Sequence, residues 1–200
     1  MNNETQPLAE FLSEVASATV SPASGTVVGV VAGMGTALCE MVCVHLRDAA
    51  VRTDADLTEL QRTLNSERER LLTLAEEDAA VVEELFGTGD GGDNPSVHKR
   101  SVGIPLALAE SCLTVLEAAS VVTGAADRPV VVDAGIGASF VDGALRSALF
   151  TVRTNVASVD DESFRAETDR RVADIESAAE RAARLTMENA GTDGIGRSRE

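Results

Sequence analysis

Three carboxylates lie at positions where the surrounding residues would keep them away from water. Asp78 falls on the apolar stripe of a heptad pattern, Glu40 interrupts the most hydrophobic segment of the chain, and Asp133 begins a run of small residues. Burial disfavours the charged form of a carboxylate and raises its pKa toward values that suit proton transfer. We therefore treat Asp133, Asp78 and Glu40 as candidates for general acid–base chemistry.

Each of these carboxylates also has a plain structural explanation, which the sequence leaves open. Asp133 stands at a predicted helix start, where an aspartate can simply cap the helix. Asp78 can be a core carboxylate paired with an arginine such as Arg153, and Glu40 can be paired in a similar way.

The sequence Ser24-Gly25-Thr26 is a third feature that could bind a ligand, because it ends a loop and begins a helix. The free N–H groups of a helix N-terminus favour a polar or anionic ligand atom. Capping of the helix by Ser24 explains the same residues equally well.

Histidines and cysteines do not form a metal-binding pattern in this sequence. His45 and His98 are isolated from acidic and cysteine partners, and Cys39, Cys43 and Cys112 match no zinc spacing. The three cysteines lie in apolar runs, which favours reduced thiols in the core. We predict no metal ion and no cofactor.

Apolar spacing predicts the elements that must position these residues: about six helices and no strand. The first predicted helix follows a potential cap at Thr5 and stops at Ser21-Pro22. The others cover roughly residues 24–46, 54–85, 97–123 and 133–156, and a last one runs from Asp160 or Asp161 to about residue 190, with Pro105 near the start of the fourth. Residues 87–96 contain four glycines and a proline and are predicted to form a surface loop. We expect one domain over residues 1–190 and a flexible tail over 191–200.

The helix at 24–46 has a membrane span as its alternative, because Gly25, Gly29 and Gly33 repeat at the spacing of lipid-embedded helix contacts. Only 14 residues, Thr26 to Cys39, precede Glu40. A span needs about 20 apolar residues. A buried central helix with a glycine groove is therefore the favoured prediction.

The chain is strongly acidic, with 33 acidic against 17 basic residues and a formal net charge of -16. This charge would repel nucleic-acid phosphates and anionic membranes, so we expect neither as a partner. Lys99 is the only lysine, and an acidic, lysine-poor surface suggests a halophilic source in which salt screens the repulsion. No export signal is evident at the N-terminus, and we expect a cytoplasmic protein.

Five short motifs occur in the order typical of the cyclodeaminase/cyclohydrolase family of folate enzymes, which this sequence resembles over roughly residues 8–187. The motifs are Pro22-Ala23-Ser24-Gly25-Thr26 at the family's glycine-rich turn, Glu76-Glu77-Asp78-Ala79 at its D-E-D-A, Ile104-Pro105-Leu106 at its V-P-L, and Asp133-Ala134-Gly135 with Val152-Arg153-Thr154-Asn155 at its SDAG and NVxxN. The resemblance implies an all-α, elongated, up-and-down helical bundle that dimerises along its long helices.

The resemblance also implies a folate substrate bound in a crevice, where a tetrahedral carbon forms. Catalysis would then fall to Asp133, Asp78 and Glu40, with no cofactor beyond the folate itself. The implied substrate-binding residues are Ser24, Gly25, Thr26, Thr151, Arg153 and Asn155. Arg146 and Arg153 could hold the glutamate tail of the folate or neutralise the buried acids.

Hydrolysis of 5,10-methenyltetrahydrofolate to 10-formyltetrahydrofolate is the leading functional prediction, because no transferase domain in these 200 residues would supply a formimino substrate. The alternative activity is that of a formimidoyltetrahydrofolate cyclodeaminase. A catalytically degenerate relative that binds a folate or a partner is a further alternative. Ala23 and Ser24 replace two glycines of the family's turn, and Val132 and Thr151 also depart from its motifs. Whether the loop at 87–96 closes over a ligand is left open.

Overall fold

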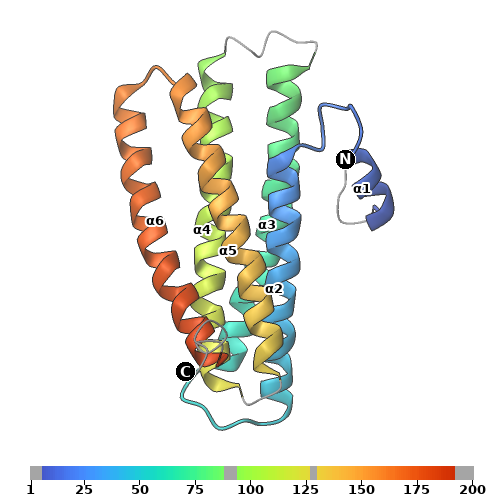
Figure 1. The fold of residues 1–200 in the computed structure, drawn as a ribbon, viewed down its shortest axis with the longest axis vertical. Coiled ribbons are helices and arrows are strands. Elements are labelled where there is room, and N and C mark those ends of the chain that lie inside the picture. Colours follow the sequence, from blue (N-terminus) through green and yellow to red (C-terminus); the bar gives the residue numbers. More distant parts are fainter. Residues whose placement is uncertain (1–5, 88–93, 127–129, 192–200) are drawn as a thin grey trace, which may run out of the picture.

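The computed structural model describes residues 6–87, 94–126 and 130–191. Within these residues it confirms the all-α fold, with six α-helices and no strand (Figure 1). The helices are α1 (Leu8–Val15), α2 (Ser24–Asp48), α3 (Leu57–Phe86), α4 (Pro95–Ala125), α5 (Val131–Asn155) and α6 (Glu162–Asn189), and a short 3₁₀ helix, η2 (Val156–Ser158), follows α5.

Four long helices form the centre of an elongated up-and-down bundle. Helix α2 packs against α3 and α5, and α4 packs against the same two helices, so the four make a closed ring. Helix α6 covers α4 and α5 from outside, while α1 stands to the side of the bundle (Figure 1). The end of the bundle where α2 begins is therefore also where α3 and α5 end.

Polar residues set the starts of several helices, as expected from their capping chemistry. Asp56 accepts hydrogen bonds from the N–H groups of Thr58 and Glu59, and Asn94 and Asp161 cap α4 and α6 in the same way. Helix α5 differs from its prediction, because it begins at Val131 and places Asp133 inside the first turn. Asp133 therefore does not cap this helix.

Glycine allows α2 to approach its neighbours closely, which confirms the predicted glycine groove. A Cβ atom at Gly29 would lie 2.7 Å from the Cβ of Ala75 in α3. At the contact with α5, a Cβ at Gly35 would lie 2.5 Å from the carbonyl oxygen of Gly137. Two backbones in such contact leave no room for side chains between them.

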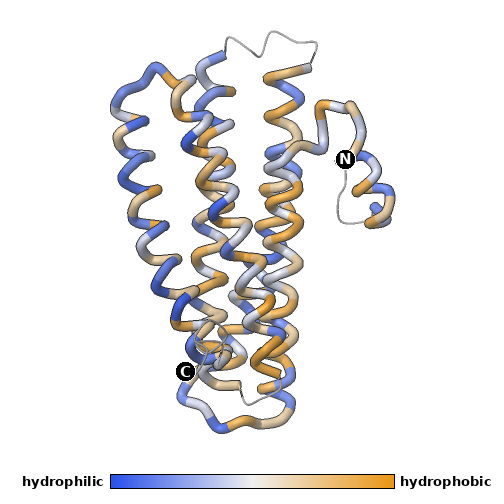
Figure 2. The backbone as a smooth tube through the Cα atoms, in the orientation of Figure 1, coloured by the Kyte–Doolittle hydropathy of each residue, from blue (hydrophilic) through white to orange (hydrophobic). Residues whose placement is uncertain are grey.

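Helices α2 and α4 are long and apolar enough to cross a membrane. Core helices of globular proteins share these properties. The most apolar stretch of α4 is 61% buried within the bundle, whereas that of α2 is only 44% buried. Helix α2 is apolar along most of its length while α6 is mainly hydrophilic (Figure 2).

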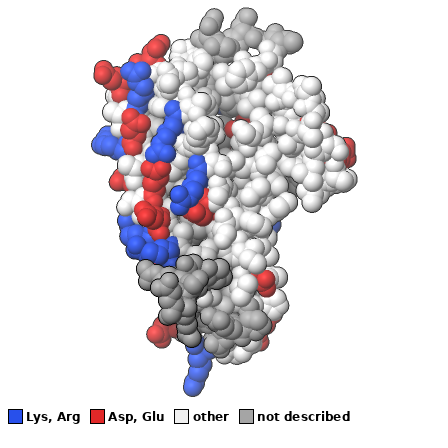
Figure 3. All heavy atoms as spheres, viewed as in Figure 1, with Lys and Arg blue, Asp and Glu red and all other residues white. Residues whose placement is uncertain are grey.

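One face of the bundle exposes apolar side chains of α2 and α5. These residues, which we call the α2–α5 face, are Met34, Met41, Val132, Ile136 and Phe140. In Figure 3 the charged side chains gather over α6, and the neighbouring surface over α2 and α5 is largely uncharged.

Two predicted segments fall mainly outside the described residues. These are 88–93 of the predicted loop and 192–200 of the predicted tail.

Candidate functional site

A cavity of about 290 Å³ lies at the end of the bundle where α2 begins. We call it the Asp78 cavity, after the only acidic side chain among the described residues that line it. Its lining residues are Val20, Ala23, Ser24, Gly25, Asp78, Val81, Val82, Leu85, Phe86, Ser101, Thr151 and Asn155. Four helices thus contribute to one small site, and most of its wall is apolar.

Asp78 projects from α3 and is only 7% exposed. Burial raises the pKa of its carboxyl group, and the neighbouring amide and hydroxyl of Thr26 lower it by less. The Oδ2 atom is buried and has no hydrogen-bond partner among the described residues. A buried carboxyl oxygen without a partner at a cavity wall is available to a proton donor on a ligand.

The first turn of α2 explains why the carboxylate sits where it does. Ala23 precedes this helix and has no side chain that could cap it, and the first turn contains no acidic residue. Asp78 lies against Gly25, and its carboxylate accepts a hydrogen bond from the backbone amide of Thr26. A carboxylate from α3 therefore supplies the negative charge that this helix N-terminus favours.

The predicted role of Ser24, Gly25 and Thr26 in ligand binding changes accordingly. The amide of Thr26 faces Asp78, so the carboxylate occupies the place where an anionic ligand atom was expected. Ser24 is the first residue of α2 and makes no capping hydrogen bond. Ser24 and Gly25 still line the cavity, whereas Thr26 is fully buried behind it.

The described wall of the cavity carries no positive charge to compensate that of Asp78, because none of its described lining residues is Lys, Arg or His. Together with the buried carboxyl group, this composition favours a ligand that is cationic or that donates protons.

A shallow groove of about 490 Å³ adjoins the cavity along α2 and α5. We call it the α2–α5 groove; its residues are Ser24, Val28, Arg146, Ser147, Phe150, Thr151, Thr154 and Asn155. Ser24, Thr151 and Asn155 line both spaces, so the groove and the cavity adjoin at these residues. A ligand longer than the cavity can therefore extend toward Arg146 and the exposed ring of Phe150.

Asn155 and Ser101 meet at the wall of the cavity. The Nδ2 atom of Asn155, the last residue of α5, donates a 2.8 Å hydrogen bond to the carbonyl oxygen of Ser101 in α4. The sequence prediction missed Ser101. The sequence feature that could have indicated Ser101 is Pro105, four residues later, because a proline cannot donate the helical hydrogen bond to the Ser101 carbonyl.

The expected meeting of Asp133 with Asp78 in one groove is wrong. Asp133 is exposed in the first turn of α5, and the carbonyl of the next residue, Ala134, accepts from Cys39 Sγ at 3.7 Å. Cys39 lies 14 residues along α2 from Gly25. At 1.5 Å per residue this places Asp133 about 21 Å from the Asp78 cavity.

Glu40 and Arg153 also lie away from the cavity, each in an ion pair between helices. Glu40 pairs with Arg68 of α3 at 3.0 Å, and Arg153 pairs with Glu176 of α6 at 2.6 Å. The alternative pairing of Asp78 with Arg153 is therefore absent. Neither Glu40 nor Arg153 lines the cavity or the groove, so both predicted site positions are corrected.

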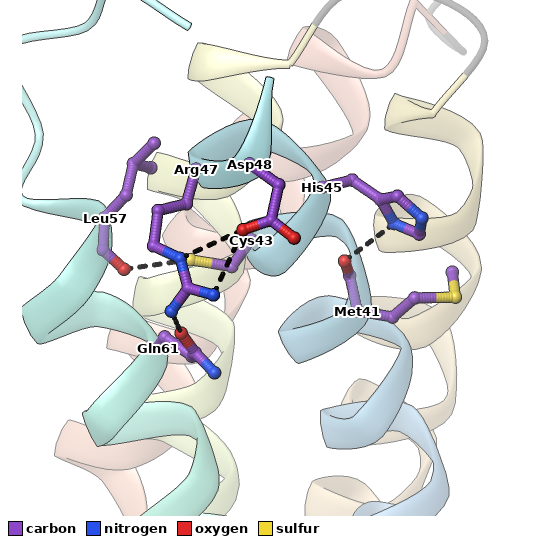
Figure 4. A network of polar contacts seen from close by, with 7 residues as sticks. All are labelled: Met41, Cys43, His45, Arg47, Asp48, Leu57 and Gln61. Atoms are coloured by element: carbon purple, nitrogen blue, oxygen red, sulfur yellow. Dashed lines mark hydrogen bonds and ion pairs between the residues drawn. The ribbon is translucent and has the colours of Figure 1, made fainter. Parts of the chain in front are cut away.

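A polar network at the opposite end of α2 ties this helix to α3 (Figure 4). Arg47 bonds to Gln61 and pairs with Asp48, and the thiol of Cys43 donates to the carbonyl of Leu57 at 3.3 Å. His45 bonds instead to a carbonyl of its own helix. These contacts join α2 to α3 and stabilise the end of α2. They explain the positions of Arg47 and Cys43 without a ligand.

The cysteines are free and buried. Burial raises the pKa of Cys39 and of Cys112 to about 12, which keeps both thiols protonated and unreactive. Within the described part of the chain, no group of three or more His, Cys, Asp or Glu residues is arranged to hold a metal ion.

Comparisons with known proteins place this geometry in context. The model of the formiminotransferase-cyclodeaminase family matches residues 7–174. A methenyltetrahydrofolate cyclohydrolase of Methylorubrum extorquens is 26% identical over 179 residues, covering 82% of this chain and 85% of the relative. A formimidoyltransferase-cyclodeaminase of Sus scrofa is 25% identical over 197 residues, which cover 92% of this chain but only 36% of the relative.

The fold also has a solved counterpart. The crystal structure of a formiminotetrahydrofolate cyclodeaminase from Thermotoga maritima superposes with a TM-score of 0.85 at 19% identity. The match covers 94% of this chain and 98% of that structure, so the arrangement of helices is shared along nearly the whole length.

Proposed function

Because the chain belongs to the formiminotransferase-cyclodeaminase family, we propose that it hydrolyses 5,10-methenyltetrahydrofolate to 10-formyltetrahydrofolate in the Asp78 cavity. One observation carries the proposal: a buried carboxyl group has a raised pKa and an oxygen without a partner among the described residues, and the described residues that line its cavity carry no positive charge. The cyclohydrolase relative, most of whose length this chain matches, supports the choice of reaction.

The methenyl bridge of the substrate is cationic, and the Asp78 carboxylate stabilises it by charge. Binding of the cation also favours the ionised form of Asp78, which can then act as a base. Asp78 takes one proton from water while the water oxygen bonds to the methenyl carbon, giving a neutral tetrahedral intermediate. The carbon–N5 bond then breaks as N5 receives the proton from Asp78. The carboxylate regenerated at Asp78 takes the hydroxyl proton as the formyl C=O forms and releases it to solvent water.

The two adjoining spaces suit the two parts of a folate. The Asp78 cavity, at about 290 Å³, accommodates the reacting ring system, and the α2–α5 groove accommodates the aromatic and glutamate portions. Arg146 lies in the groove, where its guanidinium can attract the carboxylates of the glutamate. We place the substrate with its methenyl carbon toward Asp78 and its tail toward Arg146.

The glycine-rich turn departs from the family at Ala23 and Ser24 but keeps glycine at position 25. Position 25 is the one where the Asp78 carboxylate closes on α2, because a Cβ there would lie 2.3 Å from Oδ1. Retention of Gly25 therefore preserves the placement of the proposed catalytic group, which favours an active enzyme over a degenerate relative.

A cyclodeaminase activity is the second candidate function. The Sus scrofa relative and the Thermotoga maritima structure carry that activity in their names. Closure of a formimino group also passes through a tetrahedral carbon and needs one acid–base group, so the same Asp78 would serve.

A second copy of this chain is the proposed protein partner. The α2–α5 face follows two adjacent helices of 25 residues each, and it exposes large apolar side chains with little charge. Such a surface is typical of a dimer interface, in which the same face of both copies is used. The acidic net charge of -16 supports neither a nucleic-acid nor an anionic-membrane partner, and we place the enzyme in the cytoplasm with the folate pool it would use.

The proposal is tested by mixing the purified protein with 5,10-methenyltetrahydrofolate in molar KCl and following the substrate's absorbance. Hydrolysis faster than in buffer supports the cyclohydrolase. Release of ammonia from formimidoyltetrahydrofolate supports the cyclodeaminase instead. Folded protein that accelerates neither reaction removes the enzyme proposal, and calorimetric binding of folates without turnover would indicate a degenerate relative.

A further inference from the structure

Pro105 creates an unusual hydrogen-bond acceptor inside helix α4. It is the eleventh residue of this helix, well inside it rather than near its start as predicted. Proline has no N–H group, so the carbonyl of Ser101, four residues earlier, loses the donor that an α-helix would supply. Ser101 is only 8% exposed, which limits access of water to this part of the helix.

Asn155 replaces the missing donor from a different helix. Its Nδ2 atom lies 2.8 Å from the Ser101 carbonyl oxygen. A carbonyl oxygen can only accept, so the amide group of Asn155 must direct its nitrogen to Ser101 and its Oδ1 away from it. The proline in α4 thus determines that Asn155 directs its Oδ1 atom, and not its Nδ2 atom, away from Ser101.

The Oδ1 atom of Asn155 belongs to the proposed substrate site. Asn155 lines both the Asp78 cavity and the α2–α5 groove. Among the described residues, no side chain or amide donates a hydrogen bond to its Oδ1. A fixed acceptor at the junction of the two spaces complements the Asp78 carboxyl group deeper in the site.

We propose that Asn155 Oδ1 accepts a hydrogen bond from an N–H group of the folate, and that Pro105 is a positioning residue that orients this acceptor through Ser101. This inference rests on the proposed function. A ring amide or amino group of the substrate is the donor class that the acceptor selects. The orientation is set before the ligand arrives, because the Ser101 carbonyl fixes the amide in the free protein.

The test is a double-mutant cycle of Asn155→Ala and Pro105→Ala, measured for both thermal stability and steady-state kinetics. Asn155→Ala alone should lower Tm, because it leaves the Ser101 carbonyl without a donor. In the Pro105→Ala background the new N–H of residue 105 can reach that carbonyl. The same Asn155→Ala change should then lower Tm much less.

Kinetics should behave differently from stability. We expect Asn155→Ala to raise KM about tenfold, as for a lost substrate hydrogen bond, and to do so in both backgrounds. Pro105→Ala alone should raise KM about threefold without lowering Tm, because the amide of Asn155 becomes free to turn. Pro95→Ala is the matched control, since a proline at the first position of α4 removes no helical hydrogen bond.

The outcomes separate the inference from the proposed function. If the unmodified protein turns over neither folate, the proposed function fails, while the stability cycle still reports whether Pro105 and Asn155 are coupled. If turnover is present but the double variant recovers the KM of the unmodified protein, Asn155 has only a structural role and the inference is overturned. Additive changes in Tm would overturn the orienting role of Pro105.

Discussion

The carboxyl group of Asp78 lies directly against Gly25 at the first turn of α2. A Cβ atom at residue 25 would lie 2.3 Å from Oδ1 and 2.5 Å from Oδ2 of Asp78. The consecutive helices α2 and α3 thus meet through a residue without a side chain and the one carboxylate among the described lining residues of the cavity. This contact holds the candidate catalytic group in place, and it is the basis of the first two predictions.

Gly25→Ala should displace Asp78. The added methyl group overlaps both carboxyl oxygens, and we expect destabilisation of about 1–3 kcal/mol together with at least tenfold lower kcat. Gly103→Ala is the matched control, because its Cβ would meet no atom within 4 Å. That helical change should be neutral or stabilising by up to about 1 kcal/mol. Equal behaviour of the two variants in urea unfolding and turnover would contradict the contact.

Asp78→Asn should abolish most of the activity. Loss of the acid–base group is expected to lower kcat by about 10²–10⁴-fold, as measured by the absorbance assay. Asp133→Asn serves as the comparison, because that exposed carboxylate lies at the other end of α5 and should change kcat less than twofold. A larger effect at Asp133 than at Asp78 would move the active site to the opposite end of the bundle.

The stability of Asp78→Asn should differ from that of the unmodified protein in a pH-dependent way. Burial raises the pKa of Asp78 in the folded state, so the folded protein binds more protons than the unfolded chain between the two pKa values. The stability that protonation provides is therefore lost as pH rises through the folded pKa. We expect the difference in Tm between Asp78→Asn and the unmodified protein to shift in favour of Asp78→Asn as pH rises above about 4, the unfolded-state pKa of an aspartate. A Tm difference that stays constant as pH rises would argue against the raised pKa.

Ile136→Glu should separate the proposed dimer. Its side chain is 44% exposed on the α2–α5 face, and a charge there would be buried between two copies. Leu185→Glu is the control, because Leu185 is 46% exposed but lies on the charged helix α6. Light scattering should find the first variant monomeric at concentrations where the second keeps the native mass. A monomeric unmodified protein would refute the interface.

Salt should stabilise the protein if the acidic composition reflects a halophilic source. With a net charge of -16, repulsion between carboxylates is strong at low ionic strength and is screened as salt is added. We expect Tm to rise from about 0.1 M to about 2 M KCl. An unchanged Tm over this range would count against the hypothesis.

Local patterns were sufficient to predict the helices. Apolar residues on one side predicted α1, α3 and α6, and long runs of apolar or small residues predicted α2, α4 and α5. The burial of Asp78 followed from its position on the apolar stripe of α3. Ordered motifs also led to the family, since a motif's type and spacing are properties of the chain itself.

The partners of each polar side chain were decided only by the tertiary structure. Glu40 forms an ion pair with Arg68, and Arg153 forms one with Glu176. Asp133 is exposed to solvent about 21 Å from Asp78. Periodicity gives the face of a helix on which a residue lies, but it does not give the axial register between that helix and its antiparallel neighbour. The axial register places Asp78 beside Gly25 and Asn155 beside Ser101, and it therefore defines the site.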